Sequence, residues 1–279
     1  MRAHPLVVAA LTGTLLTAPG HAELSRSWPI CKGDDLDAGP EQRIANCTAI
    51  IESPQETRDR RAGAYFYRAL AWRVVGNLQR AITDLTEAIA LNPRYDSAYG
   101  WRGKLLVDIG EYDRAVANDT EALKVFPDND GYVGSRGYAH FYRADFPASA
   151  ADLYRAIQLI PYSTHNQDRA PMLYLARARA GQDGTADLEA QVDRWKRINR
   201  QIPLVVELYL GRSSPEVMFK AVDSLRTQCE TNFHVGQWHL IRNNRDEARR
   251  LLQVASSKSC DGFHPTYPGA VAELKRMGS

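Results

Sequence analysis

A pattern that repeats three times at a fixed spacing of thirty-four residues occupies residues 62–163 of the chain. Three kinds of residue recur in register from one copy to the next. They are a proline (Pro93, Pro127, Pro161), an alanine (Ala88, Ala122, Ala156) and an arginine (Arg68, Arg102, Arg136). A fixed period of this length is typical of proteins built from stacked copies of one unit. The repeat therefore predicts three equivalent units, each packed on its neighbours.

Small residues hold set places in each copy and indicate what the unit is. The three sets are Ala69, Gly103 and Gly137; Gly76, Gly110 and Ala144; and Ala81, Ala115 and Ser149. Glycine takes a left-handed turn conformation without steric cost, and small residues on facing helices allow a close approach. Proline ends the second helix because it cannot donate the next helical hydrogen bond. Each copy is therefore expected to be a helix, a tight turn and an antiparallel second helix.

These residues resemble the tetratricopeptide repeat, and the resemblance implies an all-α fold, a helical solenoid of antiparallel helix pairs. One position departs from the family pattern. Asp119 stands where the pattern has a large apolar residue. We expect either looser packing in the second unit or a pairing of Asp119 with a neighbouring arginine.

The first residues have the features of a secretory signal peptide. Arg2 and His4 precede an apolar run over residues 6–18, and Gly20-His21-Ala22 offers small residues at a cleavage site. The run is too short to span a bilayer. We expect residues 1–22 to be removed and the exported chain to begin at Glu23, with a buried first helix as the alternative. Because no cysteine follows the cleavage site directly, a lipid anchor is not expected.

Four cysteines suit an oxidising compartment, where disulfides persist. If Cys229 begins a further repeat-like unit, Gly236 falls on a small position and Cys260 falls where the proline belongs. The start of helix one and the end of helix two lie side by side in an antiparallel pair, which predicts a Cys229–Cys260 bridge. The remaining pair is Cys31 and Cys47, in which Cys31 would fasten the incoming strand. The alternative is four buried free thiols.

The segments outside the three repeats are also expected to be helical. Residues 23–61 form an N-terminal cap with a partial repeat, since residues 43–51 align with residues 81–89. Residues 164–279 are expected to hold degenerate helical repeats and a C-terminal capping helix. Within them, helices are expected at residues 168–180, 185–199, 203–210, from Ser214 towards Arg226, in the Cys229 unit and at 269–277.

Three segments of the C-terminal half, residues 203–211, 229–236 and 248–255, resemble the NlpI family of Gram-negative envelope proteins. That family is known for adaptors that dock a periplasmic protease and bring peptidoglycan hydrolases to it. The resemblance implies a periplasmic adaptor whose partners are proteins or peptides. The chain departs from the family in lacking the lipid-anchor cysteine and in carrying the Cys31 and Cys47 segment.

Composition and spacing exclude several other classes. The chain is 44% hydrophobic and 24% charged with a net charge of +2, which argues against a nucleic-acid partner. No apolar run after the leader is long enough for a membrane span. The histidines show no metal-ligand spacing, since His234 and His239 fall on different faces of one helix. No cofactor, metal or catalytic residue is therefore predicted.

Two short motifs resemble functional sites and are better explained by the repeat. Ser135 lies in a faint nucleophile-elbow pattern, but the pattern begins with Val133 instead of glycine. Ser135 also aligns with ordinary positions of helix one. Residues 128–131 suggest part of a calcium loop but lack its distal glutamate, so they are interpreted as a turn and a helix cap.

The three aligned arginines allow two interpretations. They could form a ladder for carboxylate ligands, or each could pair with an acid on the second helix of its own unit, as Asp84 and Asp152 allow. Identical spacing in every copy favours the structural role.

Partner binding is expected in the groove formed by the first helices of successive units. The resemblance to the tetratricopeptide repeat implies these groove-facing residues: Phe66, Leu70, Arg73, Lys104, Asp108, Tyr138 and Tyr142. Aromatic side chains mixed with arginine are common anchors of protein interfaces. In the alternative, several of these tyrosines pack against the next repeat.

The sequence thus predicts an exported, non-enzymatic adaptor of the periplasm. One alternative is a self-associating scaffold of the envelope, for which a homodimer is the simplest form. A second is an enzyme with a site in the degenerate half.

Overall fold

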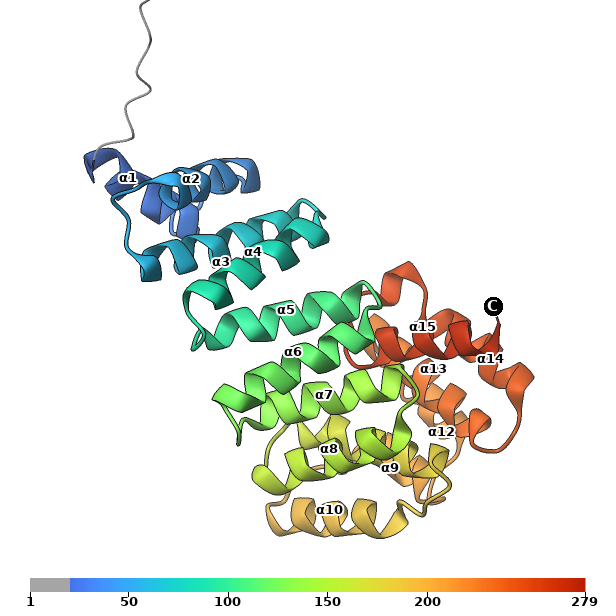
Figure 1. The fold of residues 1–279 in the computed structure, drawn as a ribbon. Helices are drawn as coiled ribbons and strands as arrows, with labels where there is room; N and C mark the ends of the chain where they lie inside the picture. Colours follow the sequence, from blue (N-terminus) through green and yellow to red (C-terminus); the bar gives the residue numbers. More distant parts are fainter. Residues whose placement is uncertain (1–20, 279) are drawn as a thin grey trace, which may run out of the picture. The chain divides into compact units, whose positions relative to one another are not determined.

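The computed structural model describes residues 21–278, with side-chain surroundings from Arg26 onward. Apart from its last two residues, the expected signal peptide lies outside the described residues. Every regular element in the described range is helical, and consecutive helices pack as antiparallel pairs (Figure 1). The all-α fold class is therefore confirmed. The chain divides into two compact units, one ending at Asn92 and the other beginning at Pro93.

The first unit contains the helices α1 (His21–Lys32), α2 (Pro40–Glu52), α3 (Arg58–Val74) and α4 (Leu78–Leu91). A disulfide joins Cys31 to Cys47 at the centre of a small core that includes Ile50 and Ala64. The segment that carries Cys31 was expected to be an extended strand, but it is the helix α1. The bridge therefore holds two helices together.

The turn between α3 and α4 has the geometry that the repeat predicts. Gly76 has a φ of 79°, a left-handed conformation that suits glycine. Thr57 caps the start of α3, and Asn77 caps α4 by accepting a hydrogen bond from the Arg80 amide. In the third repeat Ala144 takes the same conformation at φ 68°, which is strained for a residue with a Cβ.

The second unit begins with two further helix pairs of the repeat. These are α5 (Asp96–Asp108) with α6 (Tyr112–Val125), and α7 (Asp130–Tyr142) with α8 (Phe146–Leu159). The small residues are needed for the helices to approach. A Cβ on Gly137 would lie 2.9 Å from Cγ of Leu153, and one on Gly103 would lie 2.8 Å from Nδ2 of Asn118.

The remaining helices complete the second unit. They are α9 (Asn166–Arg179), α10 (Thr185–Arg197), α11 (Leu204–Tyr209), α12 (Pro215–Lys220), α13 (Leu225–Leu240), α14 (Arg245–Ala255), a 3-10 turn (Lys258–Cys260) and α15 (Thr266–Met277). One expectation was wrong. The helix predicted from Ser214 towards Arg226 ends at Lys220, and Ser224 starts α13 through a capping box with Thr227.

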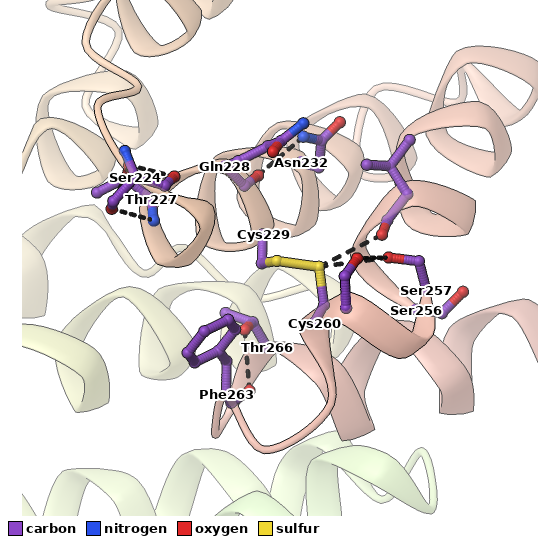
Figure 2. The surroundings of a disulfide bond; sticks show 12 residues. Ser224, Thr227, Gln228, Cys229, Asn232, Ser256, Ser257, Cys260, Phe263 and Thr266 are labelled. Atoms are coloured by element: carbon purple, nitrogen blue, oxygen red, sulfur yellow. Dashed lines mark hydrogen bonds between the residues drawn. A yellow bond between two sulfur atoms is a disulfide. The ribbon is translucent and has the colours of Figure 1, made fainter.

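The pair α13 and α14 carries the second disulfide, which joins Cys229 to Cys260. Cys229 lies one turn inside α13, and Cys260 lies in the 3-10 turn that follows α14. Figure 2 shows the bridge tying α13 to the segment that bears Phe263 and Thr266. Gly236 lets the two helices meet, since a Cβ there would lie 3.0 Å from Cγ of Leu252.

None of the helices that the structure describes is both long and apolar enough to cross a membrane.

Candidate protein-binding surface

The three groove residues predicted in the first unit lie on α3 and differ in exposure. Phe66 is buried and meets the ring of Tyr67 edge to face. Leu70 is half-buried, whereas Arg73 is exposed in the last turn. The neighbouring Val74 is 59% exposed. This end of α3 therefore presents apolar and cationic surface, while Phe66 belongs to the packing beneath it.

Lys104 and Asp108, predicted on the second repeat, form an ion pair one turn apart on α5. Asp108 Oδ1 also lies 3.2 Å from Nε2 of His264, near the C-terminus. Partial burial raises the pKa of Asp108, but hydrogen bonds from His264 and Lys104 outweigh it, so this pKa lies below its usual value. The Asp108 carboxylate is thus already bonded to His264 of the same chain.

The two predicted anchors of the third repeat lie on α7 among residues of the C-terminal segment. Tyr142 is 2% exposed, and its hydroxyl donates to the carbonyl oxygen of Pro265 at 3.0 Å. Arg276 donates in turn to the carbonyl oxygen of Tyr142 at 2.6 Å. Tyr138 is half-buried, and burial raises its pKa. Tyr142 therefore packs inside the fold and offers no free surface to a partner.

The segment that covers these positions is residues 260–277, which we call the C-terminal cover. Its helix α15 packs against α7, and Figure 1 shows it near the ends of α5 and α7. Gly269 permits the contact, because a Cβ there would lie 2.7 Å from Phe233 and 3.5 Å from Tyr142. The sequence predicted a capping helix at residues 269–277, but not that it would pack over Tyr142. The one local signal of this packing is Gly269, a glycine inside a helix.

The aligned arginines have the structural role. Arg68 binds both carboxylate oxygens of Asp84 at 2.8 Å, and Arg136 binds both of Asp152 at 2.7 and 2.8 Å. Arg102 differs because asparagine stands at the equivalent position of its second helix. It donates to Asn118 at 2.7 Å and reaches Glu121 at 2.8 Å. The arginines therefore join the two helices of each pair.

Asp119 is 1% exposed and forms no ion pair with an arginine in the described part of the chain. Its carboxylate accepts a hydrogen bond from Nδ2 of Asn118 at 2.8 Å. Burial raises the pKa of Asp119 to about 6, against the opposing effect of hydrogen bonding. The apolar position of the repeat thus holds a buried carboxyl group.

The two motifs that resembled functional sites are parts of the repeat. Ser135 is half-buried within α7. Asn129 caps α7 by accepting from the Tyr132 amide, and Asp130 pairs with Arg169 at 2.7 Å. Within residues 21–278, no three side chains of the metal-binding types gather at one place.

Comparisons with known proteins agree with this architecture. No family model and no curated protein matches the chain. A tetratricopeptide repeat protein from Parabacteroides merdae is similar in structure, with a TM-score of 0.59 and 14% identity over 91% of this chain and 98% of that one. MamA from Desulfovibrio magneticus RS-1 aligns with a TM-score of 0.52 and 17% identity, over 64% of this chain and 98% of that one. At these identities the likeness shows the fold alone, and that fold is the all-α, antiparallel-pair fold of tetratricopeptide-repeat proteins.

Proposed function

We propose that the protein is a non-enzymatic adaptor that binds other proteins through the first helices of its repeats. One observation carries the proposal. The first helix of the third repeat, α7, already holds another helix, since α15 lies against it and Arg276 of α15 donates to the carbonyl oxygen of Tyr142. A face that accepts one amphipathic helix has the shape and polar groups to accept another, which is a common mode of peptide recognition.

The surface left for a partner in the first unit is the end of α3. Leu70, Arg73 and Val74 lie three and four residues apart, so they share one side of the helix. Val75, which follows, is 40% exposed. We call these four residues the α3 patch. Apolar side chains beside an arginine suit a partner helix that carries apolar residues flanked by an acid.

We place the adaptor in the periplasm and propose that its clients include a protease and cell-wall hydrolases. The two disulfides support an oxidising compartment. The resemblance of residues 203–211, 229–236 and 248–255 to the NlpI family supports this class of client.

Photo-crosslinking tests the proposal with a matched pair of positions. A photoreactive residue at Val74 probes the α3 patch, and one at the exposed Glu87 on α4 probes the opposite helix of the same pair. The expected result is a discrete adduct in periplasm at position 74 and none at position 87. A protease or hydrolase in the adduct would support the proposed clients, whereas a second copy of the chain would support a self-associating scaffold. Equal labelling at both positions would contradict a binding face on α3.

A further inference from the structure

A cavity of about 430 Å³ lies in the second unit, separate from the α3 patch. Its walls come from α9, α11, α12, α13 and the start of the C-terminal cover. Its lining includes the apolar side chains of Leu204, Val205 and Met218. A cavity of this size with apolar side chains and a few polar groups has the usual features of a small-ligand site. We call it the α9–α13 pocket.

The pocket lining also carries three charged groups, Asp168, Arg226 and Glu230, of which two are acids. Arg226 Nη1 lies 3.4 Å from Oε1 of Glu230, and its guanidinium stacks over the ring of Phe263. Asp168 forms no ion pair or side-chain hydrogen bond with any residue that the structure describes. The pocket lining thus holds two carboxylates and one guanidinium, while His165 and Arg169 also act on Asp168 from outside the lining.

Asp168 is exposed and Glu230 is half-buried, so a ligand can reach both carboxylates. Partial desolvation raises the pKa of each of them, and the proximity of Asp168 adds to the rise at Glu230. A cation bound beside the two carboxylates would stabilise the ionised form of both, because a nearby opposite charge favours the charged form of a carboxyl group.

His234 adds a buried polar group to the same cavity. It is 8% exposed, and its Nδ1 lies 2.8 Å from the hydroxyl oxygen of Tyr209, which itself lies outside the pocket lining. Nε2 has no hydrogen-bond partner among the described residues. Burial lowers the pKa of His234 to about 3, so the ring is neutral at physiological pH. It therefore offers one hydrogen-bonding nitrogen and no repulsion to a cation.

The pocket wall is fixed covalently. Cys229 directly precedes Glu230 on α13, and its partner Cys260 begins the segment that brings Pro265 and Thr266 to the lining. Figure 2 shows Thr227 and Thr266, both of which line the pocket, near the disulfide. The bridge thus holds α13 and the cover in a fixed relation, which lowers the conformational cost of binding.

We propose that the α9–α13 pocket binds a primary ammonium group attached to an apolar side chain. Asp168 and Glu230 would hold the ammonium group, the Leu204, Val205 and Met218 wall would take the side chain, and His234 would bond a further polar atom. Both the amino terminus of a peptide and a small free amine have this chemistry. The inference is independent of the proposed adaptor function, because it concerns different helices.

Titration calorimetry of the intact, oxidised protein with matched probes tests the pocket. Leucinamide carries the ammonium group and the apolar side chain, whereas N-acetyl-leucinamide lacks only the charge. Leucinamide is expected to bind and its acetylated form is not. The tripeptide Leu-Ala-Ala distinguishes the sources, since tighter binding than leucinamide indicates a peptide terminus and weaker binding a small amine. Equal binding of the charged and acetylated probes, or binding of none of them, would overturn the proposal.

Two variants and one control localise the site. Asp168→Asn and Glu230→Gln each remove one carboxylate charge, and each is expected to weaken leucinamide binding by about tenfold to a hundredfold, the range for a hydrogen bond to a charged group. Glu216→Gln removes one carboxylate charge at an exposed position of α12, outside the pocket, and should leave binding unchanged. If a charge variant fails to fold by circular dichroism, Leu204→Trp fills the cavity from a 39%-exposed position and should abolish binding. Unchanged binding in a folded variant would place the ligand elsewhere.

Discussion

Arg179 on α9 and Glu273 on α15 are 94 residues apart in the sequence, yet Nη1 of the arginine lies 2.6 Å from Oε1 of the glutamate. Arg276 Nη2 lies at the same distance from that oxygen. Glu273 is 1% exposed, and Arg179 is also held over the ring of Phe146. This cluster fastens the C-terminal cover to the helices of the repeat.

Glu273→Ala is expected to lower the free energy of unfolding by about 3–5 kcal/mol, because it leaves two arginines near a buried site without their counter-charge. The exposed pair Glu247 and Arg250 on α14 provides the control. Glu247→Ala should cost less than about 1 kcal/mol, as exposed ion pairs usually do. Urea unfolding followed by circular dichroism compares the two. Equal losses would mean that the cluster does not anchor the cover.

Tyr142 should behave as a core residue and not as a partner anchor. Tyr142→Ala is expected to cost about 3–5 kcal/mol of stability, as for other large buried aromatic residues. Tyr142→Phe removes only the hydrogen bond to Pro265 and should cost about 1 kcal/mol. Arg73→Ala, on the exposed α3 patch, should change stability by less than about 0.5 kcal/mol. If Tyr142→Ala were as stable as Arg73→Ala, the cover would not pack on α7.

The Cys229–Cys260 bridge closes a loop with a sequence separation of 31 residues. The chain-entropy model gives a stabilisation of about 3–4 kcal/mol for a loop of this length. The double variant Cys229→Ser with Cys260→Ser should lose about that much, with the exposed Ser259→Ala as a control for the turn. Peptide mapping without reductant should join the two cysteines directly. A Cys47–Cys260 peptide would contradict the pairing.

The repeat region could be predicted from the sequence because its information is local and periodic. Gly76 and Gly110 mark the turns, and the arginine of each copy finds its partner sixteen residues later, an aspartate in two copies and an asparagine in the third. The Cys229–Cys260 pairing followed from the same register. These features depend on residues within one helix pair, where spacing alone determines which side chains meet.

The C-terminal cover and the pocket could not be predicted in this way. Tyr142 and Pro265 are 123 residues apart, and no repeat register relates them. Asp168 and Glu230 come from helices in the degenerate half, where the period is lost. The start of α13 did have a local signal in the sequence, because Ser224 and Thr227 form a capping box. The prediction of one longer helix from Ser214 missed this signal.

Asp119 is expected to make the protein less stable as the pH rises. Its folded pKa is raised from 3.8 to about 6, so the folded state binds the proton more tightly than the unfolded chain does. The stability from this group is present below about pH 4 and is lost as the pH rises through about 6.

Asp119→Asn keeps an acceptor for Asn118 and carries no charge at any pH. Relative to the variant, the wild-type chain should therefore lose up to about 3 kcal/mol between pH 4 and pH 7.5. Urea unfolding of both proteins across this range measures the difference, in which the other carboxyl groups cancel. Parallel stability curves would show that Asp119 titrates normally in the folded state. If the variant instead lost stability relative to the wild type as the pH rises, folding would lower the pKa of Asp119, which would contradict the prediction.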